Sequence, residues 1–388
     1  MAQVPVNPDE QVVITEEVDH VRLITLNRPR QLNVISSDVV SLLAKNLEKW
    51  EKDDDAELIL IKGAGRAFSA GGDLKMFYDG RNIEDSCLEV AYRMYWLCYH
   101  HHSYKKTQVA LVNGICMGGG ASLMVPMKFS VVTEKAVFAM PEASIGFHTD
   151  CSFTYILPRL PGYLGAYLAL TGARLNWKEL IALGLATHFV PSEKLPDLEK
   201  CLISLNSGDK NSVKSVIEEF SVDVQPDEDS ILNKQSIIDK CFCKESIEEI
   251  IYSFETEGSV GGNEWIHPVV KGLKRSSPTG LKITFRSICE GRKQSLAECL
   301  KREFRLTVNI LRAKISGDVY EGIRAVTVDK DNSPKWDPPS LDGVDSEKVD
   351  LVFQPFKEEL ELQIPANKEC RWDGKYENTA YPSLKAKA

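Results

Sequence analysis

The chain has 388 residues, of which 43% are hydrophobic, 27% charged and 8% aromatic. This length and composition fit one large domain or two moderate ones, and they exclude a disordered, collagen-like or silk-like protein. The formal net charge of −9, with no stripe of Lys and Arg, argues against a nucleic-acid partner. No stretch reaches the roughly 18 apolar residues that a membrane span needs, so no membrane partner is expected either.

The two ends of the sequence show no targeting signal. The first twenty residues are acidic and contain no Arg, and the last three are Ala386, Lys387 and Ala388 rather than Ser-Lys-Leu. The ten cysteines are scattered without a C-x-x-C pair, which is typical of core thiols in a reducing compartment. The default expectation is a cytoplasmic protein, and peroxisomal import without a visible C-terminal signal stays open.

The first half of the chain alternates strand-like with helix-like segments, as α/β domains do. Apolar and β-rich runs predict strands at residues 21–26, 57–61, 108–112, 129–132 and 136–140. A helix is predicted between the first two strands, with Ser37 and Asp38 as candidate caps. Its buried face is predicted from apolar residues at helical spacing: Val39, Leu43, Leu47 and Trp50.

From about residue 195 the sequence becomes charged and has helical periodicity, for example at 244–254 and 296–311. Ser277 and Pro278 predict the start of another helix. From about residue 334, prolines spread among charges predict an irregular extension that frays over its last ten or so residues. We therefore expect an α/β core at 10–195, a helical region at 196–335 and an irregular C-terminal extension at 336–388.

Two glycine-rich turns each follow a strand-like run and precede a helix-like run. They cover residues 68–73 (FSAGGD) and 114–120 (GICMGGG). Glycine lets the backbone approach a ligand, and N–H groups at a helix start point outward, so two such turns side by side could form an oxyanion hole. Taken alone, either turn is more simply explained as a tight turn needed for packing. Neither matches a dinucleotide fingerprint or a phosphate loop.

Four motifs occur in a fixed order: LNRP-x-QLN at 26–33, AGGD at 70–73, NGI-x-MGGG at 113–120 and MPE at 140–142. This series resembles the crotonase superfamily of acyl-CoA enzymes. Segments such as FAMPE-A-x-IGF, RLPG-x-LG, GLATHFVPS and VDKDNSPKW narrow the resemblance to the 3-hydroxyisobutyryl-CoA hydrolases, especially their plant hydrolase-like branch. The match extends from about Gln11 to Trp336. It implies an α/β crotonase (ClpP-like) fold of repeated ββα units in a spiral, with a helical C-terminal region.

The resemblance also implies roles for individual residues. It places the two oxyanion-hole N–H groups at Gly72 and Gly119, where they would stabilise negative charge on a thioester oxygen. Glu142 matches the catalytic glutamate of the family. Asp150 matches its second carboxylate, which holds the substrate hydroxyl and takes part in proton transfer.

Coenzyme A is expected as part of the acyl-CoA substrate, and no cofactor is implied. By the same resemblance, Leu32, Ala70 and Asp73 are the candidate CoA-binding residues. Cations near Arg30 could meet phosphate. Relatives often assemble as trimers or pairs of trimers through the helical region, so a homo-oligomer stays open.

The predicted reaction is hydrolysis of a short 3-hydroxyacyl-CoA thioester, such as the 3-hydroxyisobutyryl ester of valine breakdown. Hydratases of the superfamily carry a second glutamate two residues after the glycine triplet, and here that position is Ser122. Hydration is therefore disfavoured, although an enoyl-CoA hydratase or isomerase remains the alternative enzyme. The other alternative is a non-catalytic paralogue that binds acyl-CoA without turnover.

Three departures from the hydrolase pattern fall near the expected pocket. A carboxylate of the family is replaced by Met94. The family's G-L-F-P-D segment is G-F-H-T-D here, which introduces the imidazole of His148. The small residues that follow this aspartate in the family are replaced by bulkier ones at 151–154. We expect Met94 and His148 in the substrate pocket and an altered acyl specificity. His148 could also take part in proton transfer.

Two other candidates have weaker support. The triplet at 100–102 consists of histidines, but successive helical residues point about 100° apart and no further ligand pattern accompanies them, so no metal site is predicted. Cys116 lies inside the second glycine turn with no base near it in sequence, and we interpret it as a packing residue.

Overall fold

A computed structural model describes residues 11–357 and 360–364 of the chain. Its strands form two sheets, and the described part holds the six strands of the larger sheet in the order β1-β2-β3-β5-β7-β10. Their bounds are β1 (Val13–Val18), β2 (Val21–Leu26), β3 (Leu58–Gly63), β5 (Thr107–Val112), β7 (Phe129–Val132) and β10 (His188–Phe189). All neighbours in this sheet are parallel except β1 and β2, which form an antiparallel hairpin.

The smaller sheet has the order β4-β6-β8-β9. Its strands are β4 (Ala67–Ser69), β6 (Ile115–Met117), β8 (Val137–Ala139) and β9 (Leu175–Asn176). Successive pairs along the chain, β3 with β4, β5 with β6 and β7 with β8, each give one strand to the larger sheet and the next to the smaller one. A helical turn follows each pair, so the predicted spiral of ββα units is confirmed.

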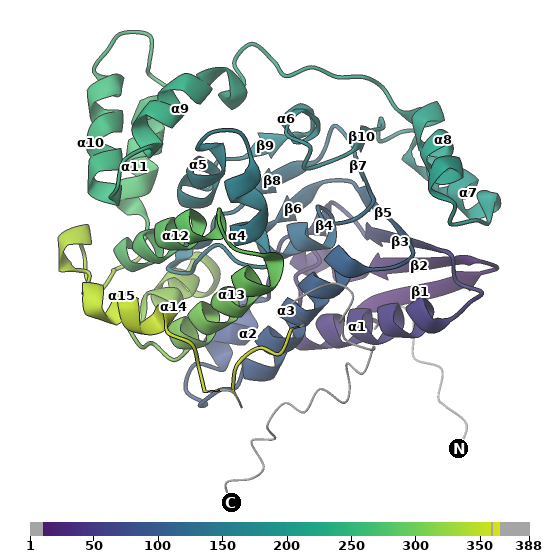
Figure 1. Cartoon of the computed structure of the whole chain (residues 1–388), viewed down its shortest axis with the longest axis horizontal. Helices are drawn as coiled ribbons and strands as arrows, with labels where there is room; N and C mark the ends of the chain where they lie inside the picture. Colours follow the sequence, from purple (N-terminus) through teal and green to yellow (C-terminus); the bar gives the residue numbers. More distant parts are fainter. Residues whose placement is uncertain (1–10, 358–359, 365–388) are drawn as a thin grey trace, which may run out of the picture.

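Both faces of the inner strands of the larger sheet are buried, which explains the continuous apolar run of β3. Ile59 and Ile61 face the cluster that includes the apolar side of α1 (Ser37–Lys52), whereas Leu58 and Leu60 face α7 (Leu195–Leu205) and α8 (Lys210–Phe220). Figure 1 shows α1 on one side of the strands and α7 and α8 on the other.

The remaining helices before residue 195 are short except α3. They are α2 (Leu74–Asp79), α3 (Leu88–Ser103), α4 (Phe153–Ile156), α5 (Leu164–Thr171) and α6 (Trp177–Ala182). Short helical turns that matter for the site are η2 (Pro29–Gln31), η3 (Gly118–Leu123) and η4 (Glu142–Ile145).

No strand follows β10 in the described part of the chain, as the helical periodicity predicts. The later helices are α9 (Gln235–Phe242), α10 (Ile247–Gly258), α11 (Ile266–Arg275), α12 (Pro278–Gly291), α13 (Leu296–Leu311), α14 (Asp318–Ile323) and α15 (Ser346–Phe353). The helix α12 packs on α5 and α13 packs on α3, and one side of each helix joins the same apolar cluster as α1. The division at 195 and 335 stays a prediction.

Two local predictions were wrong. The cap of α1 is Ser36, whose side chain accepts a hydrogen bond from the N–H of Val39, and not Ser37 or Asp38, which lie inside the helix. Residues 336–388 are not wholly irregular, because Asp345 accepts hydrogen bonds from the N–H groups of Glu347 and Lys348 and so starts α15. The fraying predicted for the last residues falls outside the described part.

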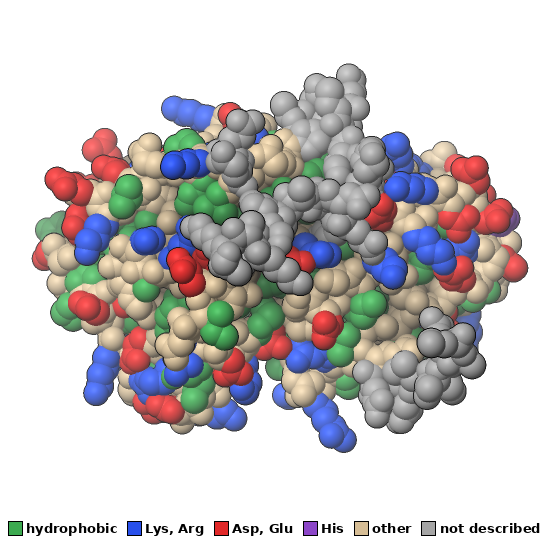
Figure 2. Space-filling view, turned by 90° about the horizontal axis from the view of Figure 1, so that it is seen from below, with side chains coloured by type: hydrophobic (Ala, Val, Ile, Leu, Met, Phe, Trp, Pro, Cys, Tyr) green, Lys and Arg blue, Asp and Glu red, His purple; other side chains and the backbone are tan. Residues whose placement is uncertain are grey.

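The described surface agrees with the composition. Acidic and basic side chains are interspersed on the face shown in Figure 2, and no basic stripe is visible there. Within residues 11–357 and 360–364, no helix is both long and apolar enough to cross a bilayer. Most described cysteines are buried and all are free thiols.

Candidate active site

The first glycine turn connects β4 to α2. The N–H of Ile35 donates to the carbonyl of Gly71 (2.8 Å), and the N–H of Asp73 donates to the carbonyl of Ile35 (3.0 Å). In a parallel bridge of this kind, the residue between the two bonded neighbours directs its own N–H away from the partner strand. The N–H of Gly72 is therefore free to face the cavity that Gly72 lines. Gly71 adopts a φ of 97°, which favours glycine.

The second glycine turn connects β6 to η3 and lies against the first. Gly119 is in the first turn of η3, where an N–H has no acceptor within the helix. A Cβ atom placed on Gly119 would lie only 3.9 Å from the amide nitrogen of Gly72. The structure thus brings together the two glycines that the motifs predicted as one site.

Glu142 starts η4 directly after Pro141 and faces these turns. A Cβ atom placed on Gly118 would lie 2.7 Å from Oε1 of Glu142, so the absence of a side chain there lets the carboxyl approach the turn. Glu142 is buried, and its Oε2 has no hydrogen-bond partner among the described residues. Burial, and secondly the charge of Asp150, hold the pKa of Glu142 well above its usual range.

Asp150 lies on the loop between η4 and α4. Its Oδ2 accepts a hydrogen bond from the hydroxyl of Tyr95 on α3 (2.7 Å). Burial raises the pKa of Asp150 to about 6, although hydrogen bonds from Tyr95 and Cys151 act in the opposite direction. The group therefore titrates close to neutral pH and can hold or release a proton.

The loop after Asp150 is strained and is anchored by Glu303 on α13. Cys151 and Ser152 have φ values of 54° and 72°, a region that side chains other than glycine rarely adopt. Glu303 is fully buried and accepts hydrogen bonds from the N–H of Ser152 (2.8 Å), the N–H of Thr154 (3.1 Å) and the hydroxyl of Thr154 (2.5 Å). Burial, and then the charge of Asp150, raise the pKa of Glu303 to about 7.

The two glycine turns, Glu142 and Asp150 line a single cavity of about 670 Å³. It contains Gly72, Gly119, Glu142, Asp150, Met94, Leu32, Ala70 and Asp73, which are eight of the nine predicted site residues. Most of its other walls are apolar, including Val40, Phe77 and Val319. The cavity thus combines an apolar surface with a few polar groups that converge on the glycine turns, as ligand sites commonly do.

His148 is the exception, and its placement in the pocket was wrong. The side chain is fully buried and lies behind the cavity wall, where its Nε2 is 2.8 Å from Oγ1 of Thr307. Thr307, on α13, lines the cavity instead. Burial lowers the pKa of His148 to about 3, so the ring is neutral at neutral pH.

The predicted CoA-binding residues lie along one rim of the cavity. The N–H of Ala70 donates to the carbonyl of Leu32 (3.0 Å), which ties the η2 turn to the first glycine turn. Asp73 accepts a hydrogen bond from the N–H of Met76 and forms an ion pair with Arg28 (2.9 Å). The side chain of Asp73 therefore caps α2 and holds Arg28 at the rim.

Sequence reasoning missed Tyr95, Thr307 and Glu303. A signal was present for the last two, because they lie four positions apart on the otherwise apolar side of α13, where Leu300 and Phe304 are buried. A buried acidic residue at such a position has a structural or catalytic reason. What it contacts could not be read from the sequence, since its partners lie 149 and 151 positions away.

The structure places both weaker candidates. Cys116 is fully buried, and burial raises the pKa of its thiol far above the usual range, which leaves it unreactive. In the histidine triplet, Nε2 of His100 meets Oε2 of Glu51 (2.9 Å) and Nε2 of His102 meets Oγ of Ser152 (3.1 Å). No group of three or more metal-ligating side chains occurs in the described part of the chain.

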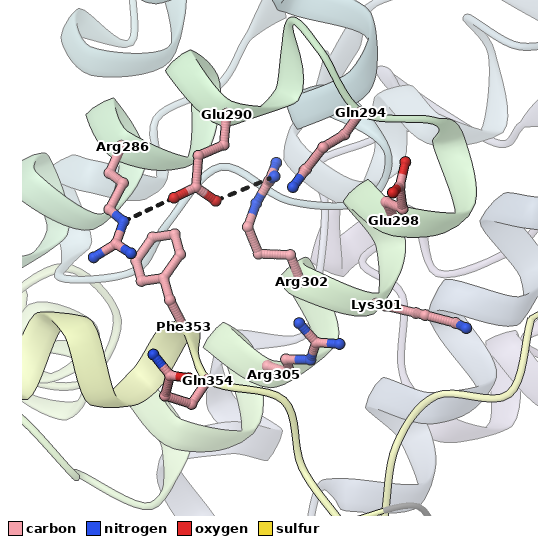
Figure 3. Close-up of a pocket in the computed structure, with 9 residues that line it drawn as sticks. All are labelled: Arg286, Glu290, Gln294, Glu298, Lys301, Arg302, Arg305, Phe353 and Gln354. Carbon is pink, nitrogen blue, oxygen red and sulfur yellow. Dashed lines mark hydrogen bonds and ion pairs between the residues drawn. The ribbon is translucent and has the colours of Figure 1, made fainter.

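A second hollow, of about 320 Å³, lies between α12, α13 and the end of α15 (Figure 3). Its lining comprises Arg286, Glu290, Gln294, Glu298, Lys301, Arg302, Arg305, Phe353 and Gln354. Glu290 lies between Arg286 (2.8 Å) and Arg302 (3.7 Å), and these contacts are the dashed lines of Figure 3. This hollow carries an ion-pair network and lacks the glycine turns of the larger cavity.

The chain is similar to known proteins over almost its full length. The family model described as enoyl-CoA hydratase/isomerase matches residues 21–353. A curated relative, "3-hydroxyisobutyryl-CoA hydrolase-like protein 5" of Arabidopsis thaliana, is 69% identical over 386 residues, covering 99% of this chain and all of that one. "3-hydroxyisobutyryl-CoA hydrolase 1" of the same plant is 41% identical, covering 91% of this chain and 94% of that one.

A solved structure shows the same fold. The crystal structure of a carnitinyl-CoA dehydratase from Mycobacterium thermoresistibile matches with a TM-score of 0.83 and 30% identity, covering 92% of this chain and all of that one. The sequence motifs, the ββα spiral and these matches agree. The chain belongs to the enoyl-CoA hydratase/isomerase family and, within it, to the 3-hydroxyisobutyryl-CoA hydrolase-like proteins.

Proposed function

We propose that the protein hydrolyses the thioester of a short 3-hydroxyacyl-CoA, with 3-hydroxyisobutyryl-CoA as the first candidate substrate. One observation carries the proposal: the adjacent backbone N–H groups of Gly72 and Gly119 share a cavity with the carboxyls of Glu142 and Asp150. The names of the two hydrolase relatives support the choice of reaction and substrate.

The two glycine N–H groups provide the oxyanion hole. When the thioester carbonyl is attacked, negative charge develops on its oxygen, and two preset donors in a buried site stabilise that charge. Loss of one such donor typically costs about 3–4 kcal/mol of transition-state stabilisation. Because both donors belong to the backbone, no rearrangement is needed as the charge develops.

Glu142 activates the attack by one of two routes. Its carboxylate either takes a proton from water, whose oxygen adds to the carbonyl carbon, or adds to that carbon itself and forms an anhydride that water then opens. In both routes the C–S bond breaks and the CoA sulfur receives a proton. In the direct route the acid leaves with the water oxygen, whereas water that opens the anhydride at the Glu142 carbonyl leaves its oxygen on Glu142 and the acid keeps a Glu142 oxygen. A single turnover in ¹⁸O-labelled water separates the routes, because only the anhydride route places label in the Glu142 side chain.

The pKa of Glu142 fits this role. Both routes begin from the ionised carboxylate, whereas burial favours the protonated form. The rate therefore rises with pH through the raised pKa of this group. In the water route, Glu142 is protonated in the first step and is then placed to return that proton to the leaving sulfur.

Asp150 accounts for the 3-hydroxyl of the proposed substrate. An ionised carboxylate offers about four acceptor positions, and the hydroxyl of Tyr95 uses one of them at Oδ2. The carboxyl also lines the cavity, so it can accept the hydrogen bond of a substrate hydroxyl. A hydroxyl two carbons from the thioester carbonyl would then lie between Asp150 and the oxyanion hole.

Ser122 argues against hydration. It occupies the position at which hydratases of the superfamily carry a second glutamate, and its hydroxyl donates to the carbonyl of Gly119 (2.7 Å). The side chain therefore stabilises the glycine turn and supplies no second carboxylate. Among the described residues that line the cavity, the carboxylates besides Glu142 are Asp150 and the ion-paired Asp73.

The test is thiol release, followed with a thiol-reactive dye, from 3-hydroxyisobutyryl-, 3-hydroxypropionyl- and isobutyryl-CoA. We expect release by the wild-type protein and a loss of roughly 10²–10⁴-fold in Glu142→Gln. The control is Glu219→Gln on the exposed side of α8, which should match the wild type.

Two outcomes contradict the proposal. Binding of the esters without any release would show a non-catalytic acyl-CoA-binding protein. Hydration of crotonyl-CoA without thiol release would show the hydratase reaction of the alternative enzyme.

A further inference from the structure

A chain of buried polar side chains leads from Asp150 along the cavity wall to His148 behind it. The hydroxyl of Tyr95 lies 2.7 Å from Oδ2 of Asp150 and 2.5 Å from Oγ1 of Thr307. Oγ1 of Thr307 in turn lies 2.8 Å from Nε2 of His148. Tyr95, Thr307 and His148 are each at most 2% exposed, so water has little access to these contacts.

The number of protons fixes the direction of this chain. Each hydroxyl has one proton, and an ionised Asp150 can only accept, so the proton of Tyr95 points to Asp150. Two hydroxyl oxygens 2.5 Å apart need a proton between them, and only Thr307 can then supply it. Since the proton of Thr307 is used in that way, its oxygen must accept from Nε2 of His148.

The opposite tautomer of the ring does not fit. If Nε2 of His148 accepted the proton of Thr307, no proton would remain between the oxygens of Thr307 and Tyr95, and they would repel each other at 2.5 Å. The other ring nitrogen, Nδ1, forms no hydrogen bond of acceptable geometry with a described residue, although the backbone of Thr149 is near enough to raise the pKa of the ring. The geometry is therefore satisfied only by a neutral ring with the proton on Nε2.

We infer that His148 is a positioning residue which, through Thr307 and Tyr95, aligns three successive donors toward Asp150 and so favours its charged form. The role in turnover rests on the proposed function, because it requires Asp150 to receive a substrate hydroxyl. The tautomer and the direction of the chain do not rest on it.

The groups around Asp150 explain why such support matters. Tyr95 on α3 and the thiol of Cys151 donate to the carboxylate, whereas the carboxyls of Glu142 on η4 and Glu303 on α13 repel its charge. Burial also disfavours the charged form of Asp150 and raises its pKa. The Tyr95 donor that the chain directs offsets part of both effects.

The surroundings of His148 keep its ring neutral. Burial lowers its pKa to about 3, the carbonyl of Thr149 raises it and the charge of Arg302 lowers it. Arg302 donates to the hydroxyl and carbonyl of Ser287 (2.9 Å each) and its guanidinium faces Glu290 in the second hollow (Figure 3). The neutral imidazole thus acts through its single N–H rather than through a charge.

The first test is ¹⁵N NMR of the wild-type protein labelled at its seven histidines, with the His148 signals assigned by their absence from His148→Gln. We expect a protonated Nε2, an unprotonated Nδ1 and no further protonation down to about pH 5. A ring protonated at Nδ1, or a charged ring at neutral pH, would overturn the inference. This measurement needs no turnover, so its result stands even if the protein hydrolyses no thioester.

The second test compares His148→Phe, which keeps the ring volume and removes the donor, with His148→Gln, which keeps a terminal N–H donor. The acid limb of kcat/KM for 3-hydroxyisobutyryl-CoA contains the ionisation of Asp150 in addition to that of Glu142. We expect His148→Phe to move the Asp150 part of this limb to higher pH by about one unit, because Asp150 loses stabilisation of its charge. Isobutyryl-CoA has no hydroxyl for Asp150 to bind, so His148→Phe should not move the acid limb of kcat/KM for this ester. His148→Gln should show the wild-type pH profile with both esters.

Thr307→Val breaks the same chain one link nearer to Asp150, and it should reproduce the shift of His148→Phe. Circular dichroism of each variant verifies the fold. Equal shifts for both esters, or a His148→Phe profile identical to the wild type in a folded protein, would reject a positioning role. Failure of every ester in the wild type would reject the proposed function instead, and the NMR result would then decide the inference.

Discussion

The cavity has two walls that are built by different means. One wall is backbone: Gly72 and Gly119 come from two turns of the ββα spiral, and their N–H groups face the ligand space. The other wall is made of side chains, with Asp150 held by Tyr95 from α3 and its loop held by Glu303 from α13. The first wall works because side chains are absent, and the second works because distant side chains meet.

This difference sets how each wall can fail. The backbone wall fails sterically, since any added atom occupies the space of the ligand. The side-chain wall fails when a buried donor or acceptor loses its partner, which costs roughly 1–3 kcal/mol per group. The predictions below test the two kinds of failure in order of expected effect.

The largest effect is expected from Gly119→Ala. The new Cβ would lie 3.3 Å from Sγ of Cys151 and 3.9 Å from the amide nitrogen of Gly72, which places it in the oxyanion hole. We expect kcat/KM for thiol release to fall by about 10²–10³-fold, as for loss of an oxyanion donor. Steady-state kinetics and thermal unfolding on the same sample separate lost activity from lost fold.

The matched control for that variant is Gly272→Ala on α11. A Cβ there would meet no atom within 4 Å, so both activity and unfolding temperature should stay close to the wild type. If Gly119→Ala retained full activity while folded, the backbone wall would not be the oxyanion hole.

The two walls also differ in how far the sequence could predict them. The glycine turns are local motifs, and the strands Val21–Leu26 and Phe129–Val132 and the helix Leu296–Leu311 were predicted with the bounds they have. In each, the signal is periodicity within a few residues. The backbone wall was therefore predictable once its motifs were recognised.

The side-chain wall depends on contacts that sequence spacing does not encode. Tyr95 meets Thr307 across 212 positions and Glu303 meets Ser152 across 151. His148 shows the consequence, because its position beside Asp150 in the sequence predicted a pocket residue while the fold turns it toward α13. Only the packing of α13 on α3 decides which polar groups become partners.

The second prediction concerns Glu303→Gln. One carboxylate oxygen of Glu303 accepts from Ser152 and the other accepts from Thr154. An amide at this position would place its NH₂ group, a donor, against the N–H donor of one of these two residues. We expect the free energy of unfolding to fall by roughly 1–3 kcal/mol and kcat/KM to fall further for hydroxylated esters than for isobutyryl-CoA. Urea unfolding and the ester panel measure the two effects, with Glu219→Gln as the exposed control.

The contribution of Glu303 to the free energy of unfolding should decrease as the pH rises. The pKa of Glu303 is raised from 4.5 to about 7, so between these values the folded state holds a proton that the unfolded state has lost. The stability that Glu303 contributes is thus fully present below about pH 4.5 and is lost as the pH rises through about 7. The difference in the free energy of unfolding between the wild type and Glu303→Gln should therefore decrease from about pH 5 to about pH 8. A difference that increases over this range would contradict a raised pKa of Glu303.

The smallest effect is expected at Met94, where the two walls meet. Met94 belongs to α3, the helix that also supplies Tyr95, yet its Cε lies 3.7 Å from the Cβ position at Gly119 in the backbone wall. Its thioether therefore limits the space for the acyl group without bonding to it. Met94→Ala should raise kcat/KM of bulkier 3-hydroxyacyl esters relative to the 3-hydroxyisobutyryl ester by about tenfold, the scale of one methylene in an apolar pocket. Met94→Leu, which conserves volume, should leave the ranking of esters unchanged. If both variants kept the wild-type ranking, acyl specificity would belong to the Asp150 wall alone.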